Sequence, residues 1–139
     1  EAQPAAPPTP PAPQLEREQR RRFDGYSPRG QKLLAGRLAA TRELLERSDD
    51  GHYALELFVT ENTDPARMER FLQRAKDLVP LTDMFVIPMS GGGAYRLRVV
   101  YGDFATREEA QEAARRLPPR YQNAFNATPR SMAELRGQI

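Results

Sequence analysis

The chain has 139 residues, with 21 Lys and Arg against 19 Asp and Glu, so its formal net charge is only +2. This balance argues against a nucleic-acid partner, and the absence of cysteine together with a single histidine, His52, excludes disulfides, thiolate catalysis and histidine-based metal clusters. No apolar run approaches the roughly 20 residues of a membrane-spanning helix, no signal-type segment is present, and the length leaves room for one small domain.

Residues 1–29 are predicted to be a proline-rich and charged linker. Residues 1–13 contain six prolines and favour an extended polyproline II spacer, with a ligand for an SH3-type groove as the alternative. Residues 14–22 are almost all charged and end in three arginines, which either are solvated or bind an anionic surface. Because the chain begins at Glu1 rather than Met, we expect a fragment whose upstream anchor or catalytic part is missing.

An amphipathic helix is predicted over residues 30–47. Its apolar stripe packs on the following domain or, alternatively, faces a partner helix in a larger assembly; we favour local packing because the stripe is short for a coiled coil. Turn residues at 48–51 then end the helix. The stripe consists of Leu33, Leu34, Leu38, Thr41, Leu44 and Leu45.

A strand and a helix follow this turn. Apolar residues alternate with other residues over 53–60, the period of a half-buried strand. Asp64 then offers an N-cap, Pro65 takes the first helical position, and Pro80 ends the helix. One face of this helix is apolar and carries Met68, Phe71, Leu72, Ala75, Leu78 and Val79.

Two further strands are predicted to form a hairpin. The apolar run at 83–89 has the length of a strand and leads into three glycines at 91–93, which suit a hairpin turn. A phosphate cradle is disfavoured there, because no Lys-Ser/Thr pair follows and the next element is a strand. In this third strand, four apolar or aromatic residues alternate with arginines and a valine: Tyr95, Leu97, Val99 and Tyr101.

The C-terminal part is predicted to contain a helix, a strand and a last short helix. Thr106 and Glu109 form a capping box, alanines give the following helix a face that approaches a sheet closely, and two prolines at 118–119 end it. Residues 121–128 are predicted to form the fourth strand and residues 129–137 a terminal helix.

The predicted order of elements is strand, helix, strand, strand, helix, strand. This is the α+β, ferredoxin-like βαββαβ topology, in which both helices cover one face of a four-stranded antiparallel sheet. We expect the other face to be open and to carry the function. The residues predicted to lie on it are Glu56, Phe58, Arg96, Arg98 and Val100.

Three segments resemble the SPOR (sporulation-related repeat) domain. The sequence YALEL at 53–57 is similar to the first SPOR strand, where glutamine usually stands in place of Glu56. The sequence YRLRV at 95–99 is similar to the third strand, whereas VYGDF at 100–104 has an altered turn. The sequence EEA at 108–110 resembles the acidic pair and alanine of the helix after that turn.

The resemblance covers residues 53–128 of a domain that we place at 48–139. It implies a non-catalytic module that recognises peptidoglycan glycan strands stripped of their stem peptides, as found at division septa. Glutamate in place of the family's glutamine removes an amide donor from the expected sugar-binding surface and adds a charge. The candidate glycan-binding residues are Glu56, Phe58, Tyr95, Arg96 and Arg98.

The residue types on this face fit a sugar polymer. Arg96 and Arg98 supply forked donors, Glu56 supplies acceptors, and Phe58 offers a ring for a sugar face. The alternative is a cross-strand ion pair on a solvated sheet, and we weigh the two equally. The register of Tyr95, which it shares with Tyr101, favours a core position on the helix side.

Other functions remain as alternatives. The second hypothesis is that the same sheet, or its edge, is a docking surface for a protein of a secretion, pilus or cell-division complex. RNA binding is disfavoured because arginines and a valine stand where stacking aromatic rings are needed. An enzyme is disfavoured because Glu56 has no outward-facing acidic partner on the third strand.

We therefore expect a bacterial envelope protein in the periplasm, tethered to the inner membrane only through a missing upstream anchor. No cofactor and no metal is expected. His52 is interpreted as an ordinary surface residue, and the glycosylation-type triplet at 126–128 is assigned no role.

Overall fold

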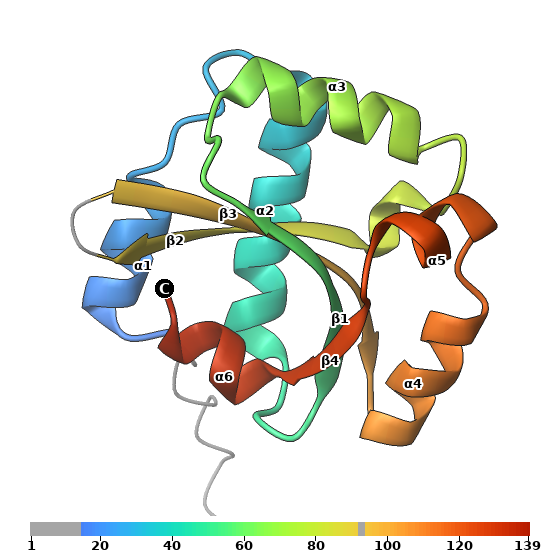
Figure 1. Cartoon of the computed structure of the whole chain (residues 1–139). Coiled ribbons are helices and arrows are strands. Elements are labelled where there is room, and N and C mark those ends of the chain that lie inside the picture. The colour runs from blue at the N-terminus through green and yellow to red at the C-terminus, as the bar shows by residue number, and fades with distance from the viewer. Residues whose placement is uncertain (1–14, 92–93) are drawn as a thin grey trace, which may run out of the picture.

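The computed structural model describes residues 15–91 and 94–139, so the polyproline prediction for 1–13 lies outside the described residues. Figure 1 shows a twisted sheet with helices packed around it. The elements are, in chain order, α1 (Arg17–Asp24), α2 (Lys32–Arg47), β1 (Tyr53–Thr60), α3 (Pro65–Ala75), the 3₁₀ turn η1 (Leu81–Asp83), β2 (Met84–Gly91), β3 (Ala94–Phe104), α4 (Arg107–Arg115), α5 (Pro119–Ala124), β4 (Thr128–Ser131) and α6 (Met132–Gly137).

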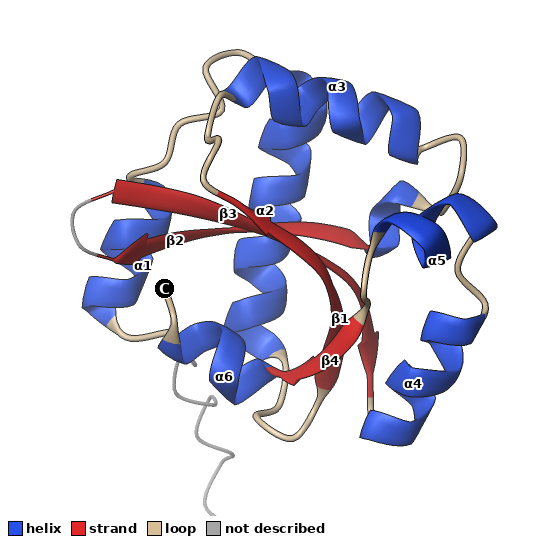
Figure 2. Cartoon of the chain, in the orientation of Figure 1, coloured by secondary structure: helices blue, strands red, loops and turns tan. Residues whose placement is uncertain are grey.

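The strands form one antiparallel sheet in the order β2-β3-β1-β4 (Figure 2). With α3 after β1 and α4 after β3, this order confirms the predicted ferredoxin-like fold. The predicted hairpin pairs β2 with β3 as far as Gly91 and Ala94, while its two central glycines lie outside the described residues.

The two faces of the sheet differ in what covers them. Tyr101 lines a groove together with residues of α4, so we call its side the α4 face. Arg98, three residues earlier on β3, points to the other side, where its guanidinium contacts Gln138 just after α6. We call this side the α6 face. Alternation along β3 also places Val100 on the α6 face and Val99 on the α4 face.

A β-bulge in β1 separates two residues that were predicted to share a face. Glu56 pairs across the sheet with Val100, whereas Phe58 pairs with Val99, so the register shifts between them. The extra residue reverses the alternation, and Phe58 therefore lies on the α4 face. The prediction that Glu56 and Phe58 lie on one face was wrong because sequence alternation does not reveal a bulge.

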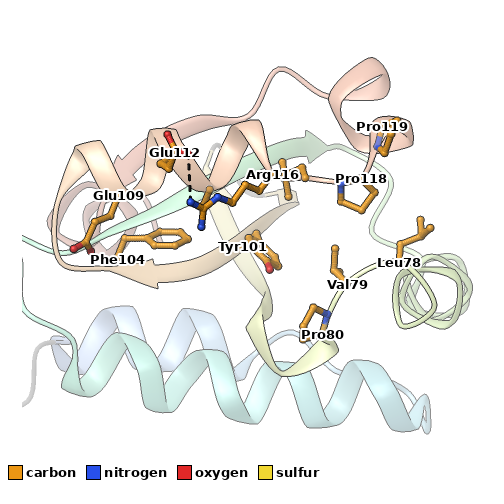
Figure 3. Close-up of a pocket in the computed structure, with 12 residues that line it drawn as sticks. Leu78, Val79, Pro80, Tyr101, Phe104, Glu109, Glu112, Arg116, Pro118 and Pro119 are labelled. Atoms are coloured by element: carbon orange, nitrogen blue, oxygen red, sulfur yellow. Dashed lines mark ion pairs between the residues drawn. The ribbon is translucent and has the colours of Figure 1, made fainter.

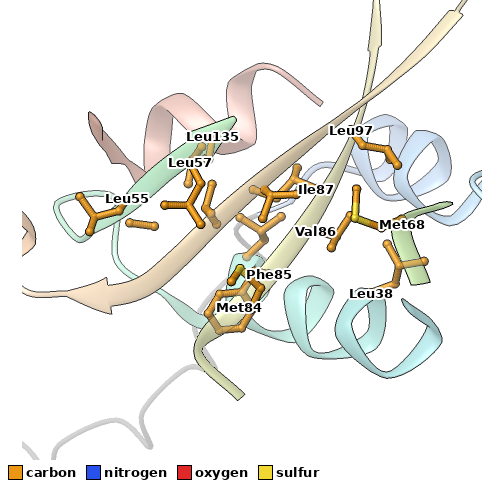
Figure 4. Close-up of a cluster of buried hydrophobic side chains, with 14 of the residues drawn as sticks. Leu38, Leu55, Leu57, Met68, Met84, Phe85, Val86, Ile87, Leu97 and Leu135 are labelled. Carbon is orange, nitrogen blue, oxygen red and sulfur yellow. The ribbon is translucent and has the colours of Figure 1, made fainter. Parts of the chain in front are cut away.

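The prediction of an open second face was also wrong. On the α6 face, Phe85 of β2 lines the same surface hollow as Ala40 and Leu44 of α2. Val100 has no exposed surface, and only 6% of Arg98 is exposed. Helices at both ends of the chain thus cover a face that the βαββαβ core alone leaves bare. Figure 4 shows part of the resulting buried cluster, in which Leu57 of β1 and Leu135 of α6 both take part.

Both ends of α2 are bonded by charged side chains from the rest of the domain. At its N-terminus the backbone amides of Leu33 and Leu34 donate to the carboxylate of Glu69 on α3, at 3.1 and 2.8 Å. At its C-terminus the guanidinium of Arg136 on α6 donates to the carbonyl oxygens of Leu45 and Ser48, at 3.1 and 2.9 Å. Each charge has the sign that the helix dipole favours. The apolar stripe of α2 thus packs on its own domain.

The same helix closes one edge of the sheet. Arg37 of α2 donates to the carbonyl oxygen of Met84, and the hydroxyl of Thr41 accepts from the amide of Val86 at 3.1 Å. These backbone groups of β2 point away from β3, as does Pro88, which has no amide to donate. The edge of β2 is therefore unavailable for pairing with another strand.

The predicted linker contains a packed helix. Over the described part of that segment, α1 buries Phe23, and Leu15 and Tyr26 on either side of the helix are buried as well. Asp24 at the end of α1 pairs with Arg42 of α2 at 2.9 Å. The charge run hid this helix, because only a few apolar residues are needed to dock so short an element.

The fourth strand was predicted in the wrong place. Residues 119–124 form α5, which starts with Pro119 in its first turn, and the strand is β4 at Thr128–Ser131. Tyr121 is buried in this helix and packs against the ring of Phe71 on α3. Residues 129–131, which were predicted to start the terminal helix, belong to this strand, and Pro129 is tolerated there because β4 lies at an edge of the sheet, beside β1.

Candidate functional site

Glu56 and Arg98, two of the five predicted site residues, form a buried ion pair. The Nε of Arg98 lies 2.7 Å from a carboxylate oxygen of Glu56, and their side chains are only 7% and 14% exposed. Arg130 of β4 lies 3.2 Å from the other oxygen of Glu56 and 3.0 Å from Glu134 of α6. Two acids and two arginines thus neutralise each other beneath α6.

Burial governs the electrostatics of this cluster. Desolvation lowers the pKa of Arg98, and the charge of Glu56 opposes that shift. The charge of Glu56 raises the pKa of Arg130, which is closer to solvent. The structure contains a cross-strand ion pair, but the pair is buried and not on a solvated sheet as the sequence alternative had it. The cluster ties β1, β3, β4 and α6 together.

Phe58 belongs to an aromatic cluster on the α4 face. Its ring centroid lies 5.2 Å from that of Phe71 on α3 and 5.1 Å from that of Phe125, which follows α5. Tyr121 of α5 extends the cluster at 5.2 Å from Phe125. The bulge in β1 thus puts Phe58 on a different surface from the Glu56 carboxylate.

Tyr95 and Arg96 lie at the other end of the sheet, beside α1. The hydroxyl of Tyr95 donates to the carbonyl oxygen of Arg22 at 2.7 Å, and its ring meets that of Tyr26 edge-on at 5.8 Å. Tyr95 therefore anchors α1. Arg96 is exposed and is the one predicted site residue whose side chain is free of the domain's packing.

A groove that the sequence did not reveal lies along α4 (Figure 3). Its volume is about 690 Å³, and it runs between α4, the end of β3 and the segment after α3. Its walls combine aromatic rings, prolines and charged side chains. Its lining includes Tyr101, Phe104, Glu109, Glu112, Arg116 and Pro80.

Gly102 shapes the floor of this groove. It has a positive φ of 81°, and a Cβ at this position would lie 2.4 Å from the ring of Phe104. Only glycine therefore allows that ring to fold back beside Tyr101. The sequence signal for this site was the aromatic pair flanking this glycine, but sequence alone did not show that both rings face α4.

Charged groups line the groove along α4. Glu112 pairs with Arg115 at 2.9 Å and with Arg116 at 3.5 Å, and all three side chains are largely exposed. Glu109 accepts from the amide of Ala105, which fixes one end of the helix. Burial, with a smaller contribution from Asp83, raises the pKa of Tyr101. A phenol is protonated at neutral pH and can donate a hydrogen bond.

The groove has the chemistry of a binding site. It offers two aromatic rings, one of which carries a phenol hydroxyl, together with a guanidinium and two carboxylates, but no histidine or cysteine of the described chain lines it. Within residues 15–91 and 94–139, no group of three or more His, Cys, Asp or Glu side chains is arranged to hold a metal ion. Among the same residues, no helix combines the length and apolar character required to cross a bilayer.

A comparison with models of known protein families found a match. The SPOR domain model matches residues 50–128, which is more than half of the chain and includes β1, β2, β3 and the first residue of β4. No protein of curated function is similar enough to be matched. The chain belongs to the SPOR domain family, whose members are peptidoglycan-binding modules rather than catalysts.

Proposed function

We propose that this domain binds the glycan strands of peptidoglycan in the groove along α4, without catalysis. The observation that carries the proposal is the juxtaposition of Tyr101 and Phe104 with Glu112 and Arg116 in one groove of a peptidoglycan-binding fold. Aromatic rings pack against the apolar faces of sugars, and the charged groups supply donors and acceptors for hydroxyl and acetamido groups.

Charge favours strands that have lost their stem peptides. Cleavage of the bond to the stem peptide leaves a free lactyl carboxylate on the muramic acid, and the guanidinium of Arg116 lines the groove and suits that group. Cleavage also removes the further carboxylates of the peptide, which Glu109 and Glu112 in the same groove would repel. We therefore propose preference for stripped glycan, which would recruit the protein to sites where stem peptides have been removed, such as division septa.

One residue of the predicted site on the sheet face stays a candidate for glycan binding. Arg96 is exposed on the α6 face, so it remains a candidate glycan contact, whereas Glu56, Phe58, Tyr95 and Arg98 bond or pack within the domain. For the cellular setting, we propose a periplasmic protein tethered to the inner membrane. Members of the family occur in periplasmic cell-division proteins, which supports this setting.

A titration with soluble N-acetylglucosamine–N-acetylmuramic acid oligosaccharides lacking peptides tests the site. Amide chemical shifts are expected to change along α4 and around Tyr101. Removing the forked donor in Arg116→Ala is expected to weaken binding about tenfold, the loss of about 1.4 kcal/mol that one charge-assisted hydrogen bond supplies.

Arg115→Ala is the matched control, because Arg115 also pairs with Glu112 but does not line the groove. Arg96→Ala distinguishes the two locations. If Arg96→Ala abolishes binding while Arg116→Ala leaves it unchanged, the glycan site lies on the α6 face and the groove proposal fails.

A further inference from the structure

The edge of the sheet at β1 is only partly covered by β4. The partner residues of β4 reach from Tyr53 to Glu56, at which point β4 ends. Phe58, Val59 and Thr60 pair with β3 on their inner side, and no described strand pairs with residues 57–60 on their outer side. Within residues 15–91 and 94–139, no backbone hydrogen bond from a loop or turn reaches residues 57–60, so this stretch of edge is open to another strand. The opposite edge, at β2, is blocked by α2.

An apolar groove runs beside this exposed edge. Its volume is about 460 Å³, and its walls come from β1, α3 and the end of α5. Phe58, Phe71 and Phe125 form its aromatic wall. Val59, on the same stretch of β1, is 40% exposed and is the one large apolar side chain classed as exposed within the described part of the chain. The groove is thus suited to large apolar side chains.

The charge around this groove is positive. Arg67 and Arg74 of α3 line it and are exposed, and Arg120 of α5 lines the adjoining hollow beside Phe71. None of these three arginines belongs to an ion pair within residues 15–91 and 94–139, although most arginines elsewhere in α1, α2 and α4 do. Among the residues that the structure describes, no acidic side chain lines the groove.

We propose that this edge docks an extended acidic segment of a partner protein, which adds as a strand to residues 57–60 of β1. Its main chain pairs with the outward backbone groups of β1, and an aromatic or aliphatic side chain enters the groove that Phe58 and Phe71 line. Its acidic side chains meet Arg67 and Arg74. Pairing of an extended peptide with a sheet edge is an established mode of recognition. This surface is separate from the groove along α4, so the protein would hold glycan and a partner at once.

The probe is a peptide selected by phage display, with the whole chain as the bait. The displayed peptides are ten residues long and carry glutamate or aspartate at alternate positions. Binding of the best peptide, synthesised with a fluorescent label, is measured by fluorescence polarisation. Hydrogen exchange is expected to slow at residues 57–60 when the peptide is bound.

Charge reversal tests the arginines. Arg67→Glu with Arg74→Glu is expected to weaken binding at least about tenfold, because the attraction becomes repulsion. The control is Arg21→Glu with Arg115→Glu, on α1 and α4. It changes the net charge of the protein by the same amount as the first double variant and is expected to leave binding unchanged. Both double variants alter exposed side chains only, so the fold is expected to persist.

The backbone of the peptide provides a second control. Methylation of alternate amides that face β1 is expected to abolish binding, whereas methylation of the other amides is not, since only the first set pairs with a strand edge. Failure to select any peptide, equal effects of the two double variants, or protection of β2 instead of residues 57–60 would overturn the proposal. So would binding of glycan fragments at this groove in place of peptide.

Discussion

Glu69 and Arg136 bind opposite ends of helix α2, although they lie on different helices, 67 residues apart in the chain. Glu69 on α3 accepts from the first turn of α2, and Arg136 on α6 donates to its last turn. Both residues are buried, with 7% and 4% of their surface exposed. Because each charge opposes the adjacent end of the helix dipole, α2 is held as part of the domain rather than as an extension of the linker.

Removal of the Glu69 carboxylate should destabilise the protein. Glu69→Ala leaves two amides at the start of α2 without an acceptor, and the free energy of unfolding is expected to fall by about 2 kcal/mol, in the range of a lost helix cap. Urea denaturation measures this change. Glu61→Ala, at an exposed position, is the control and should change stability by less than about 0.5 kcal/mol. Equal effects of the two variants would show that the cap contributes nothing.

Deletion of residues 1–47 should prevent folding. The deletion strips α1 and α2 from the domain, exposes Phe85, and leaves the edge of β2 unpaired. We expect loss of cooperative thermal unfolding by circular dichroism and aggregation on concentration. Deletion of residues 1–14, which retains both α1 and α2, is the matched control and should keep cooperative unfolding. A stable, cooperative fragment starting at residue 48 would contradict the role assigned to α2.

Glutamine, which SPOR domains usually have at the position of Glu56, should destabilise this chain. Glu56→Gln removes the charge that compensates Arg98 in a site with little solvent, and the free energy of unfolding is expected to fall by about 3 kcal/mol. Glu112→Gln, which breaks an exposed ion pair on α4, serves as the comparison and should change it by less than about 1 kcal/mol. The two values are measured by urea denaturation at neutral pH.

A rescue variant separates charge from packing at this site. Glu56→Leu combined with Arg98→Met removes both charges, so the double variant should be more stable than Glu56→Gln alone. A double variant less stable than the single one would indicate that Arg98 does not depend on its acidic partner.

Stability should fall at alkaline pH through Tyr26. Burial, assisted by the charge of Asp64, raises the pKa of Tyr26 to about 12, and its hydroxyl donates to the carbonyl oxygen of Thr63. Because the folded pKa lies above the unfolded value of about 10, this stabilisation is complete below about pH 10 and is lost as the pH rises through about 12.

The expected loss from Tyr26 is about 2 kcal/mol over that interval. Tyr26→Phe should flatten the dependence of unfolding free energy on pH between about 10 and 12, measured by urea denaturation. Tyr101→Phe is a second test of the same effect. Burial raises the pKa of that tyrosine as well, so this variant should also reduce the dependence of unfolding free energy on alkaline pH. The account of Tyr26 is wrong if its variant retains the full slope of the original protein.

The order of the core elements was predictable because each has a local cause. Asp64 accepts from the amide of Ala66 as an N-cap, and Thr106 accepts from the amide of Glu109 as predicted. Alternation in β1 and β3 marked the central strands. These signals act within a few residues of the chain, so the sequence carried them directly.

The features that the sequence did not reveal depend on contacts between distant residues. Whether Glu56 faces solvent depends on α6, which lies more than 70 residues later in the chain. The face of Phe58 depends on a bulge that alternation does not encode. The groove along α4 requires Phe104 to fold over Gly102 toward Tyr101. Residue type was therefore a good guide to chemistry but a poor guide to which residues share a surface.

Glycan recognition is tested most directly by a pull-down of the whole chain with purified peptidoglycan sacculi, before and after an amidase has removed the stem peptides. The account predicts that binding rises after amidase treatment, falls in Arg116→Ala and persists in the matched variant Arg115→Ala. Absence of binding to both forms of sacculus, with the protein folded, would contradict it.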